Sequence, residues 1–204
     1  MNEESLLDRR KMIGGVGGLA ALGALWSTPV ASAALSRAKR AAAGNFAVDV
    51  AVIGTGLGID LEAAIDAAHG DLRGASFFVE GMIYPAGTIP AGAGFNPASA
   101  TAIGNWLCRG WMIFTPARPD PQMVTHQEFM LGVIGPSNLA PEDQITTSGI
   151  EASGGTWVRS VTGGTGRFRH ARGEETQHVI GTNTTVLNKI GGHAANFHFS
   201  FELE

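Results

Sequence analysis

The sequence predicts an all-β protein whose strands close into an eight-stranded antiparallel barrel. Two observations support this fold class. The 204 residues include 29 glycines, and few strong helix formers stand in the second half, which favours short strands and turns over a helical bundle. From Gly74 onward, apolar or alternating runs are separated by clusters of glycine, proline and asparagine. Eight such runs suffice to close a small barrel with room for one small ligand.

Composition limits the classes of protein that the chain can belong to. With 44% hydrophobic and 16% charged residues, it can bury the core of one domain. The net charge is only −4 and no basic stripe with interleaved aromatic residues is present, so we expect no nucleic-acid partner. Cys108 is the only cysteine, which excludes an intrachain disulfide, and its apolar surroundings predict a buried, inert thiol.

Residues 1–33 are typical of an export signal. A positive start at Arg9, Arg10 and Lys11 precedes an apolar run over Met12–Trp26, and Ala31–Ala33 offers a small-residue cleavage site. The paired arginines favour the twin-arginine route, with the general secretory route as the alternative. The apolar run of about 15 residues is shorter than the roughly 20 that span a bilayer. We therefore expect an exported protein, periplasmic or extracellular, without stable membrane insertion after processing.

Residues 34–73 are expected to form a lead segment with one strand and a short helix. Phe46–Ile53 is apolar or alternating, and Asp60 can cap a helix that Gly70 ends. The order of strand, glycine-rich turn and helix imitates a dinucleotide-binding site. However, Ile59 stands where the fingerprint requires its third glycine, so no cofactor is expected.

Residues 74–204 are expected to form the barrel domain. The candidate strands are Ala75–Tyr84, Trp106–Phe114, Met123–Val133, Asp143–Glu151, Gly155–Thr162, Gly166–Gly173, Glu174–Thr182 and Asn196–Leu203. The stretch Pro85–Ala100 is too long for a tight hairpin and is expected to form a loop over one mouth of the barrel. Because both faces of Phe77–Tyr84 are rather apolar, we expect the outer face to pack against other elements or other subunits.

Four polar residues interrupt the apolar strand runs and are candidate site residues. Glu80 and Arg109 each stand between apolar residues two positions away, and His126 shares a strand face with Glu128. Because residues two apart on a strand point the same way, His126 and Glu128 form the best local acid/base pair. The alternative for each is a side chain that points into water or forms a structural ion pair. The remaining histidines lack the spacing of a metal motif, so no metal site is expected.

The segment Gly163–Gly173 reads GGTGRFRHARG and carries the most specific local pattern of the chain. Its first three glycines can form a tight corner that side chains would block, and Phe168 offers an aromatic ring to one face. The segment resembles the GGTG-x-F-x-x-ARG motif of the dirigent and allene oxide cyclase-like barrel family, and every fixed position is present. The resemblance covers approximately Gly74–Glu204 and includes the ending Asn196–Leu203.

The resemblance implies both a fold and a function. Members of the family form eight-stranded barrels, often associate into trimers or dimers, and confine short-lived phenolic or epoxide molecules in an apolar cavity. It implies that this chain binds a small apolar or phenolic molecule and steers its cyclisation or coupling, as an isomerase or a dirigent protein does. A non-catalytic carrier is the alternative, so whether the chain is an enzyme stays open. Arg172 aligns with the arginine of the motif and is expected to bind an oxygenated ligand or to brace the barrel.

The sequence thus supplies two sets of candidate site residues. The catalytic candidates are Arg172, His126, Glu128 and Glu80. The ligand-binding candidates are Tyr84, Phe78, Arg109 and Phe168.

Overall fold

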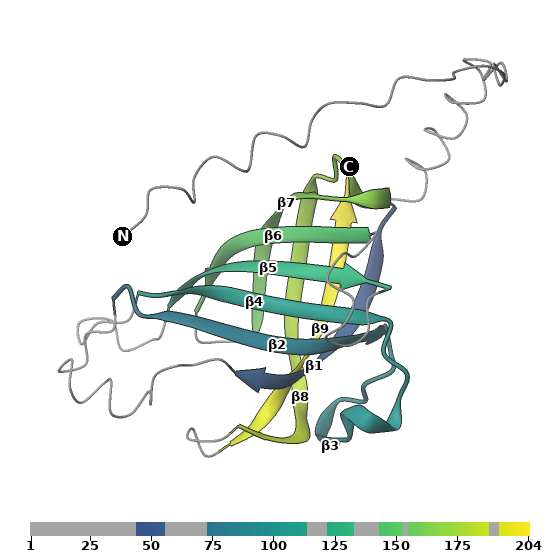
Figure 1. The fold of residues 1–204 in the computed structure, drawn as a ribbon, viewed down its shortest axis with the longest axis vertical. Coiled ribbons are helices and arrows are strands. Elements are labelled where there is room, and N and C mark those ends of the chain that lie inside the picture. Colours follow the sequence, from purple (N-terminus) through teal and green to yellow (C-terminus); the bar gives the residue numbers. More distant parts are fainter. Residues whose placement is uncertain (1–43, 56–72, 114–121, 133–142, 153–154, 188–191) are drawn as a thin grey trace, which may run out of the picture. The chain divides into compact units, whose positions relative to one another are not determined.

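The computed structural model describes residues 44–55, 73–113, 122–132, 143–152, 155–187 and 192–204. These residues belong to the second of two compact units, Ser36–Glu204. They form nine strands and two short 3₁₀ turns (Figure 1), and no helix among them is long and apolar enough to cross a membrane. The expected export signal and the expected helix that starts at Asp60 lie outside the described residues.

Eight strands close into an antiparallel barrel, which confirms the predicted fold class. The sheet order is β8-β7-β6-β5-β4-β2-β1-β9, and β9 pairs back with β8. A short strand β3, Gly92–Phe95, pairs in parallel with β8 outside this ring. The barrel strands are β1 Phe46–Thr55, β2 Ser76–Pro85, β4 Gly104–Met112, β5 Met123–Leu131, β6 Asp143–Glu151, β7 Thr156–Gly164, β8 Gly173–Leu187 and β9 Gly192–Leu203.

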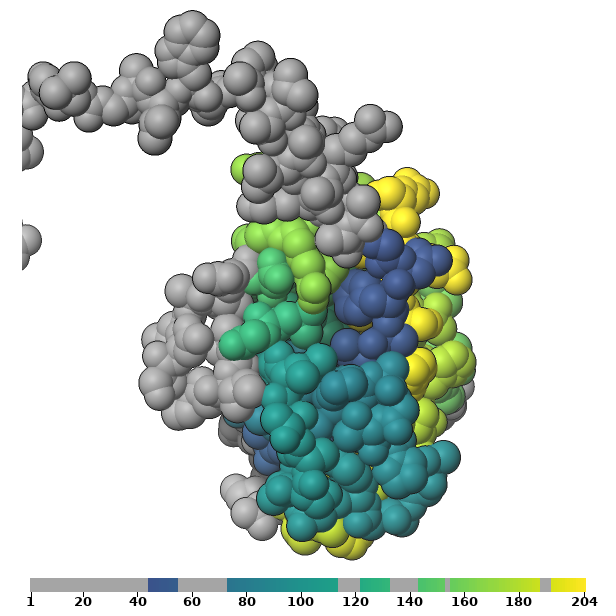
Figure 2. Space-filling model, turned by 90° about the vertical axis from the view of Figure 1, so that its right-hand side faces the viewer, coloured from purple at the N-terminus to yellow at the C-terminus, as the bar shows by residue number. Residues whose placement is uncertain are grey.

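The eight strands are not quite the eight that the sequence predicts. The strand expected in the lead segment is β1, which lies between β2 and β9 in the ring, as the order of colours in Figure 2 shows. In contrast, Gly166–Gly173 is not a strand. Gly166–Phe168 is a 3₁₀ turn, and both Gly166 and His170 have positive φ angles, of 57° and 81°. Two left-handed residues so close together reverse the chain and prevent an extended run.

An aromatic cluster fills one end of the barrel interior. The rings of Phe46 and Phe201 stack with centroids 4.4 Å apart, and Phe129 meets Phe201 edge to face at 5.0 Å. Phe168, from the 3₁₀ turn, is buried against Phe46. Such rings bury large apolar areas and fix each other's orientation. This end is therefore packed solid, and any internal space lies towards the other end.

The loop between β2 and β4 packs against the outer face of the barrel and not over a mouth, contrary to the sequence-based expectation. The backbone N–H of Ile89 donates to Asp49 Oδ2 at 3.0 Å, and the Tyr84 hydroxyl donates to the Pro97 carbonyl at 2.8 Å. Tyr84, Ile89, Ala51 and Ala102 form a second apolar cluster there. The physical reason is that β1 and β2 are apolar on both faces, so their outer face needs cover.

Candidate functional site

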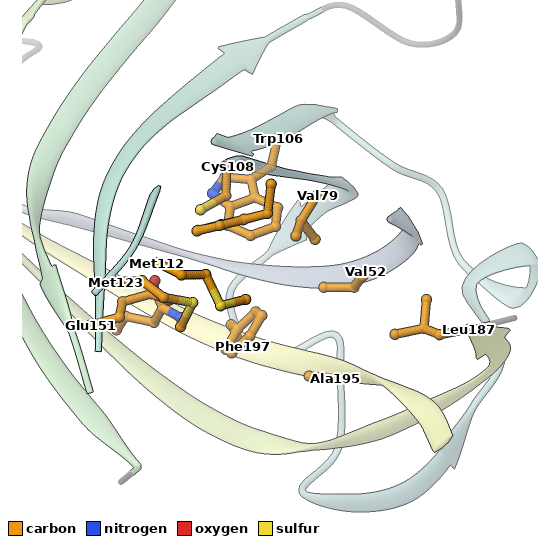
Figure 3. A pocket seen from close by; sticks show the side chains of 12 residues that line it. Val52, Val79, Trp106, Cys108, Met112, Met123, Glu151, Leu187, Ala195 and Phe197 are labelled. Atoms are coloured by element: carbon orange, nitrogen blue, oxygen red, sulfur yellow. The ribbon is translucent and has the colours of Figure 1, made fainter. Parts of the chain in front are cut away.

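A cavity of about 210 Å³ opens inside the barrel, beyond the aromatic cluster. Among the described residues, the lining side chains other than Glu151 and Gln177 are apolar, aromatic or sulfur-containing. Figure 3 shows Glu151 beside Met112 and Met123, with Leu187 at the far side of the cavity. The lining residues are Val52, Phe77, Val79, Trp106, Cys108, Met112, Met123, Glu151, Gln177, Leu187, Ala195 and Phe197.

Arg159 on β7 is the centre of a polar cluster that reaches this cavity. Its side chain is 0% exposed. Its Nε donates to Thr125 Oγ1 at 3.0 Å and its Nη1 to Gln177 Oε1 at 2.8 Å, while Nη2 is bonded to the Glu151 carboxylate. A guanidinium without solvent is costly unless carboxylates and other acceptors surround it. Arg159 meets that requirement.

The cluster also contains a second carboxyl group and two amides. Glu175 is fully buried, 3.5 Å from Arg159 Nη1, and its Oε2 accepts from the Thr147 hydroxyl at 2.9 Å. Gln127 Nε2 donates to Gln177 Oε1 at 2.9 Å and to Glu151 Oε1 at 3.1 Å. Trp106 Nε1 donates in turn to Gln127 Oε1 at 3.2 Å. Side chains from β4 to β8 are thus joined in one buried network, which rigidifies this part of the barrel wall.

Strand periodicity brings these side chains inside. Because successive side chains on a strand alternate between its faces, Thr125 and Gln127 point inward together, and so do Glu175 and Gln177. Gly149 on β6 leaves the space that Arg159 needs: a Cβ atom on Gly149 would lie 2.8 Å from Arg159 Cγ. A glycine at this position therefore lets the arginine stem cross the barrel interior.

Burial sets the protonation of the cluster. Removal from water raises the pKa of Glu151, and it raises the pKa of Glu175 to about 7; in both cases Arg159 opposes the shift. Burial also raises the pKa of the Cys108 thiol, which therefore stays protonated, as expected of an inert cysteine. Burial, together with the charge of the nearby Glu151 carboxyl group, thus favours the protonated form of Glu175 relative to an exposed glutamate.

The structure brings three of the sequence-predicted residues together, but on the outer face. Arg109 Nη2 lies 2.7 Å from Glu128 Oε1, and His126 Nε2 lies 3.6 Å from the same oxygen. The Arg109 side chain is 58% exposed. Beside these residues, a groove of about 360 Å³ is lined by Arg109, Trp111, Val124, Thr125, His126 and Ser148. The sequence-based alternative of a structural ion pair describes the contact between Arg109 and Glu128.

The other predicted residues are absent from the cavity lining. Glu80 and Phe78 are on the outer face of β2, because the inward positions of that strand are Phe77, Val79 and the residues that alternate with them. Tyr84 belongs to the cluster under the outer loop.

Phe168 is part of the aromatic cluster at the filled end. Arg172 is exposed, and its Nη1 donates to the carbonyls of Thr162 at 3.2 Å and Ala171 at 2.8 Å. Of the two roles expected for Arg172, these contacts match the bracing of the barrel turn.

Five residues of the inner cluster are absent from the candidates that the sequence supplies, namely Gln127, Glu151, Arg159, Glu175 and Gln177. A signal was present for Arg159, which stands between Trp157 and Val161 at the two-residue spacing of one strand face. The same signal singled out Arg109 between Leu107 and Trp111. Only the register of the closed barrel decides which arginine points inward.

The chain matches no family model and no curated protein. Among solved structures, it is similar to a pyocyanin demethylase, with 12% identity, a TM-score of 0.47, and coverage of 78% of this chain and 99% of that one. It is also similar to the pterocarpan synthase dirigent protein GePTS1, with 11% identity, a TM-score of 0.48, and coverage of 78% and 84%. The pterocarpan synthase dirigent protein PsPTS1 is similar as well, with 11% identity, a TM-score of 0.48, and coverage of 77% of this chain and 91% of that one. At this distance a shared function does not follow.

Proposed function

We propose that the barrel binds one small apolar or phenolic molecule in its cavity and steers its cyclisation or coupling. The observation that carries this proposal is the combination of apolar walls with a single polar end. Met112, Met123 and Phe197 provide apolar walls, and Glu151 presents a carboxyl group that is 11% exposed. Pockets for small molecules combine such walls with few convergent polar groups.

The size of the cavity suits a small ring system. Its volume of about 210 Å³ equals about seven water molecules at ~30 Å³ each. Each Å² of apolar surface that a bound ligand and the cavity wall remove from water contributes about 25 cal/mol to the free energy of binding. A flexible intermediate held in this space has few conformations left, and such confinement brings its reacting atoms together.

Glu151 gives the cavity an acid/base group. Arg159 and Gln127 both donate to its Oε1, so the carboxyl group is held in place. In a cyclisation, the carboxylate accepts the proton of the ligand's hydroxyl as that oxygen forms a bond to an electrophilic carbon of the ligand. The π bond or epoxide C–O bond at that carbon breaks, and Glu151 returns the proton to the ligand atom that receives the electron pair. No electrons are gained or lost in such an isomerisation. General acid/base catalysis of this kind contributes about 10²–10⁴ in rate.

A test of cavity binding uses 2-naphthol as the ligand and titration calorimetry as the readout. The wild-type protein should bind, and Ala195→Phe, which fills the cavity, should weaken binding by at least about ten-fold. Ala93→Phe makes the same substitution on the exposed strand β3 and should bind as the wild type does. Equal binding by all three proteins, with unchanged unfolding midpoints, would place the ligand elsewhere.

A non-catalytic carrier is the second candidate function. It is favoured by the part of the cavity lining that the structure describes, in which Glu151 is the only carboxyl group and Cys108 is the other titratable side chain. Ligands that co-purify with the mature protein separate the two functions. An unchanged bound molecule supports carriage, whereas turnover that Glu151→Gln abolishes supports catalysis. Turnover that depends instead on His126 or Arg172 would restore the assignment made from sequence.

We also propose that the protein is exported and self-associates. Export is supported by Arg9, Arg10 and the apolar run that follows them, and fractionation of cells that express the full chain tests it. Self-association is supported by an exposed row on the outer face of β4 to β7. The row consists of Trp111, Val124, Ile150 and Val158, of which Trp111 and Val124, and then Val124 and Ile150, are direct cross-strand neighbours.

An exposed apolar row of this kind supports the proposed interface between copies of the chain. Sedimentation of the wild type should show a dimer or trimer, which Ile150→Lys dissociates. Thr146→Lys, on the same face of β6 and outside the row, is the matched control.

A further inference from the structure

The polar end of the cavity, at Glu151 and Gln177, presents a hydrogen-bond acceptor and not a cation. Glu151 and Gln177 line the cavity, whereas Arg159 does not. The guanidinium is fully buried behind them, and its donors are directed to Thr125, Glu151, Gln177 and Glu175. A ligand that reaches this end therefore meets the carboxyl group of Glu151 and the amide of Gln177, and not the guanidinium.

The charges around this end do not balance. Arg159 is the one cation of the cluster, and it faces the two carboxyl groups of Glu151 and Glu175. The groups around Glu175 from each neighbouring strand are Cys108 on β4, Gln127 on β5, Thr147 and Glu151 on β6, Arg159 on β7, Gln177 on β8 and its cross-strand neighbour Phe201 on β9. With both carboxyl groups ionised, the cluster carries one uncompensated negative charge.

This second negative charge is expensive in a site without water. Burial raises the pKa of Glu175 to about 7 and also raises that of Glu151, which means that the cluster holds a proton where exposed glutamates would not. A positive group on the ligand would offset the charge and let this proton leave. A carboxylate on the ligand would instead add a third negative charge beside Arg159.

We propose that the cavity selects its ligand by charge: the end of the ligand that meets Glu151 is a hydroxyl or a protonated nitrogen, and ligands with a carboxylate at that end are excluded. This proposal rests on the cavity binding proposed above and specifies the ligand class. A cationic ligand displaces the proton of the cluster into solvent when it binds. A carboxylate ligand can enter only by taking up a further proton, and a neutral hydroxyl binds with little net proton transfer.

The test compares three ligands with the same ring and different polar ends. They are 2-naphthol, 2-naphthylmethylammonium and 2-naphthoate, titrated by calorimetry at about pH 6 and about pH 8, on either side of the Glu175 transition. At the higher pH, we expect the naphthol and the ammonium compound to bind at least about ten-fold more tightly than the naphthoate. Titrations in two buffers of different ionisation enthalpy should show proton release with the ammonium compound at the lower pH.

Two variants and one control assign this selectivity to the cluster. Glu151→Gln removes the carboxyl group that meets the ligand, and the preference over naphthoate should fall to about three-fold or less. Glu175→Gln removes the group that holds the proton, and the proton release should disappear while naphthol still binds. Glu174→Gln makes the same change on the exposed neighbour of Glu175 and should behave as the wild type does.

The outcomes separate this proposal from the one on which it rests. Equal binding of naphthol and naphthoate at about pH 8, or a preference that Glu151→Gln leaves intact, would overturn selection by charge while cavity binding stands. If Ala195→Phe leaves the affinities for all three ligands unchanged, cavity binding itself is overturned. If Glu151→Gln does not fold, the wild-type protein still decides, because equal binding of the ammonium compound and naphthoate at about pH 8 contradicts the proposal.

Discussion

The barrel carries two arginine–glutamate clusters made of the same residue types, one on its outer face and one inside. Arg109 and Glu128 lie 2.7 Å apart on the outside, where the arginine is mostly exposed. Arg159 lies inside, with no exposed side-chain surface, between Glu151 and Glu175. Water screens the outer pair, so its contribution to stability is small. Inside, each charged group is stabilised only by its protein neighbours. Because one arginine faces two carboxyl groups there, the excess negative charge is available to a ligand.

The largest expected difference between the two clusters is in stability. Arg159→Met leaves two buried carboxyl groups without their cation and should lower the free energy of unfolding by about 3–5 kcal/mol. Arg109→Met on the outer face should lower it by no more than about 1 kcal/mol. Urea unfolding at about pH 8 measures both. Equal losses would show that burial does not distinguish the clusters.

The pH dependence of stability should come from the inner cluster. Burial raises the pKa of Glu175 from its ordinary value of 4.5 to about 7 in the folded protein. Between these values the folded state binds more protons than the unfolded state, so the free energy of unfolding falls as pH rises through this window and stays lower above it. Glu175→Gln should flatten this fall in a series of urea unfolding curves. Glu174→Gln, at the exposed neighbouring position, should leave it intact.

A smaller effect is expected from the space that the inner arginine occupies. In Gly149→Ala, the new Cβ atom would approach Arg159 Cγ to 2.8 Å, and we expect a loss of about 1–3 kcal/mol from this overpacking. Gly155→Ala is the matched control, because nothing lies within 4 Å of a Cβ atom there. Thermal unfolding of the two variants compares them directly, and a Gly149→Ala protein as stable as the control would mean that Arg159 can move aside.

The smallest effect on stability is expected on the outer face. Ile150→Lys replaces an exposed side chain and should change the free energy of unfolding of the monomer by no more than about 0.5 kcal/mol. The same substitution should dissociate the oligomer. Urea unfolding under dilute conditions, together with sedimentation, separates these two effects. A large loss of monomer stability would mean that Ile150 is part of the core.

The sequence was sufficient for the fold class and insufficient for the site. Alternation and turn residues locate most strands, and Asp143–Glu151 has the predicted bounds. They could not show that Phe46–Thr55 closes the ring, because pairing between β1 and β9 joins segments about 150 residues apart. Nor could they separate Arg109 from Arg159, since both interrupt apolar runs with the same spacing. A one-residue change of register exchanges the two faces of a strand, and register is a property of the closed barrel.

A crystal structure of the protein with 2-naphthol is the most direct test of the central claim, that the ligand enters the barrel and meets the Arg159 cluster. We expect the naphthol ring among the cavity side chains near Phe197, with its hydroxyl in hydrogen-bonding distance of Glu151. A ligand bound only in the outer groove beside Trp111 and His126, with the inner cavity empty, would contradict it.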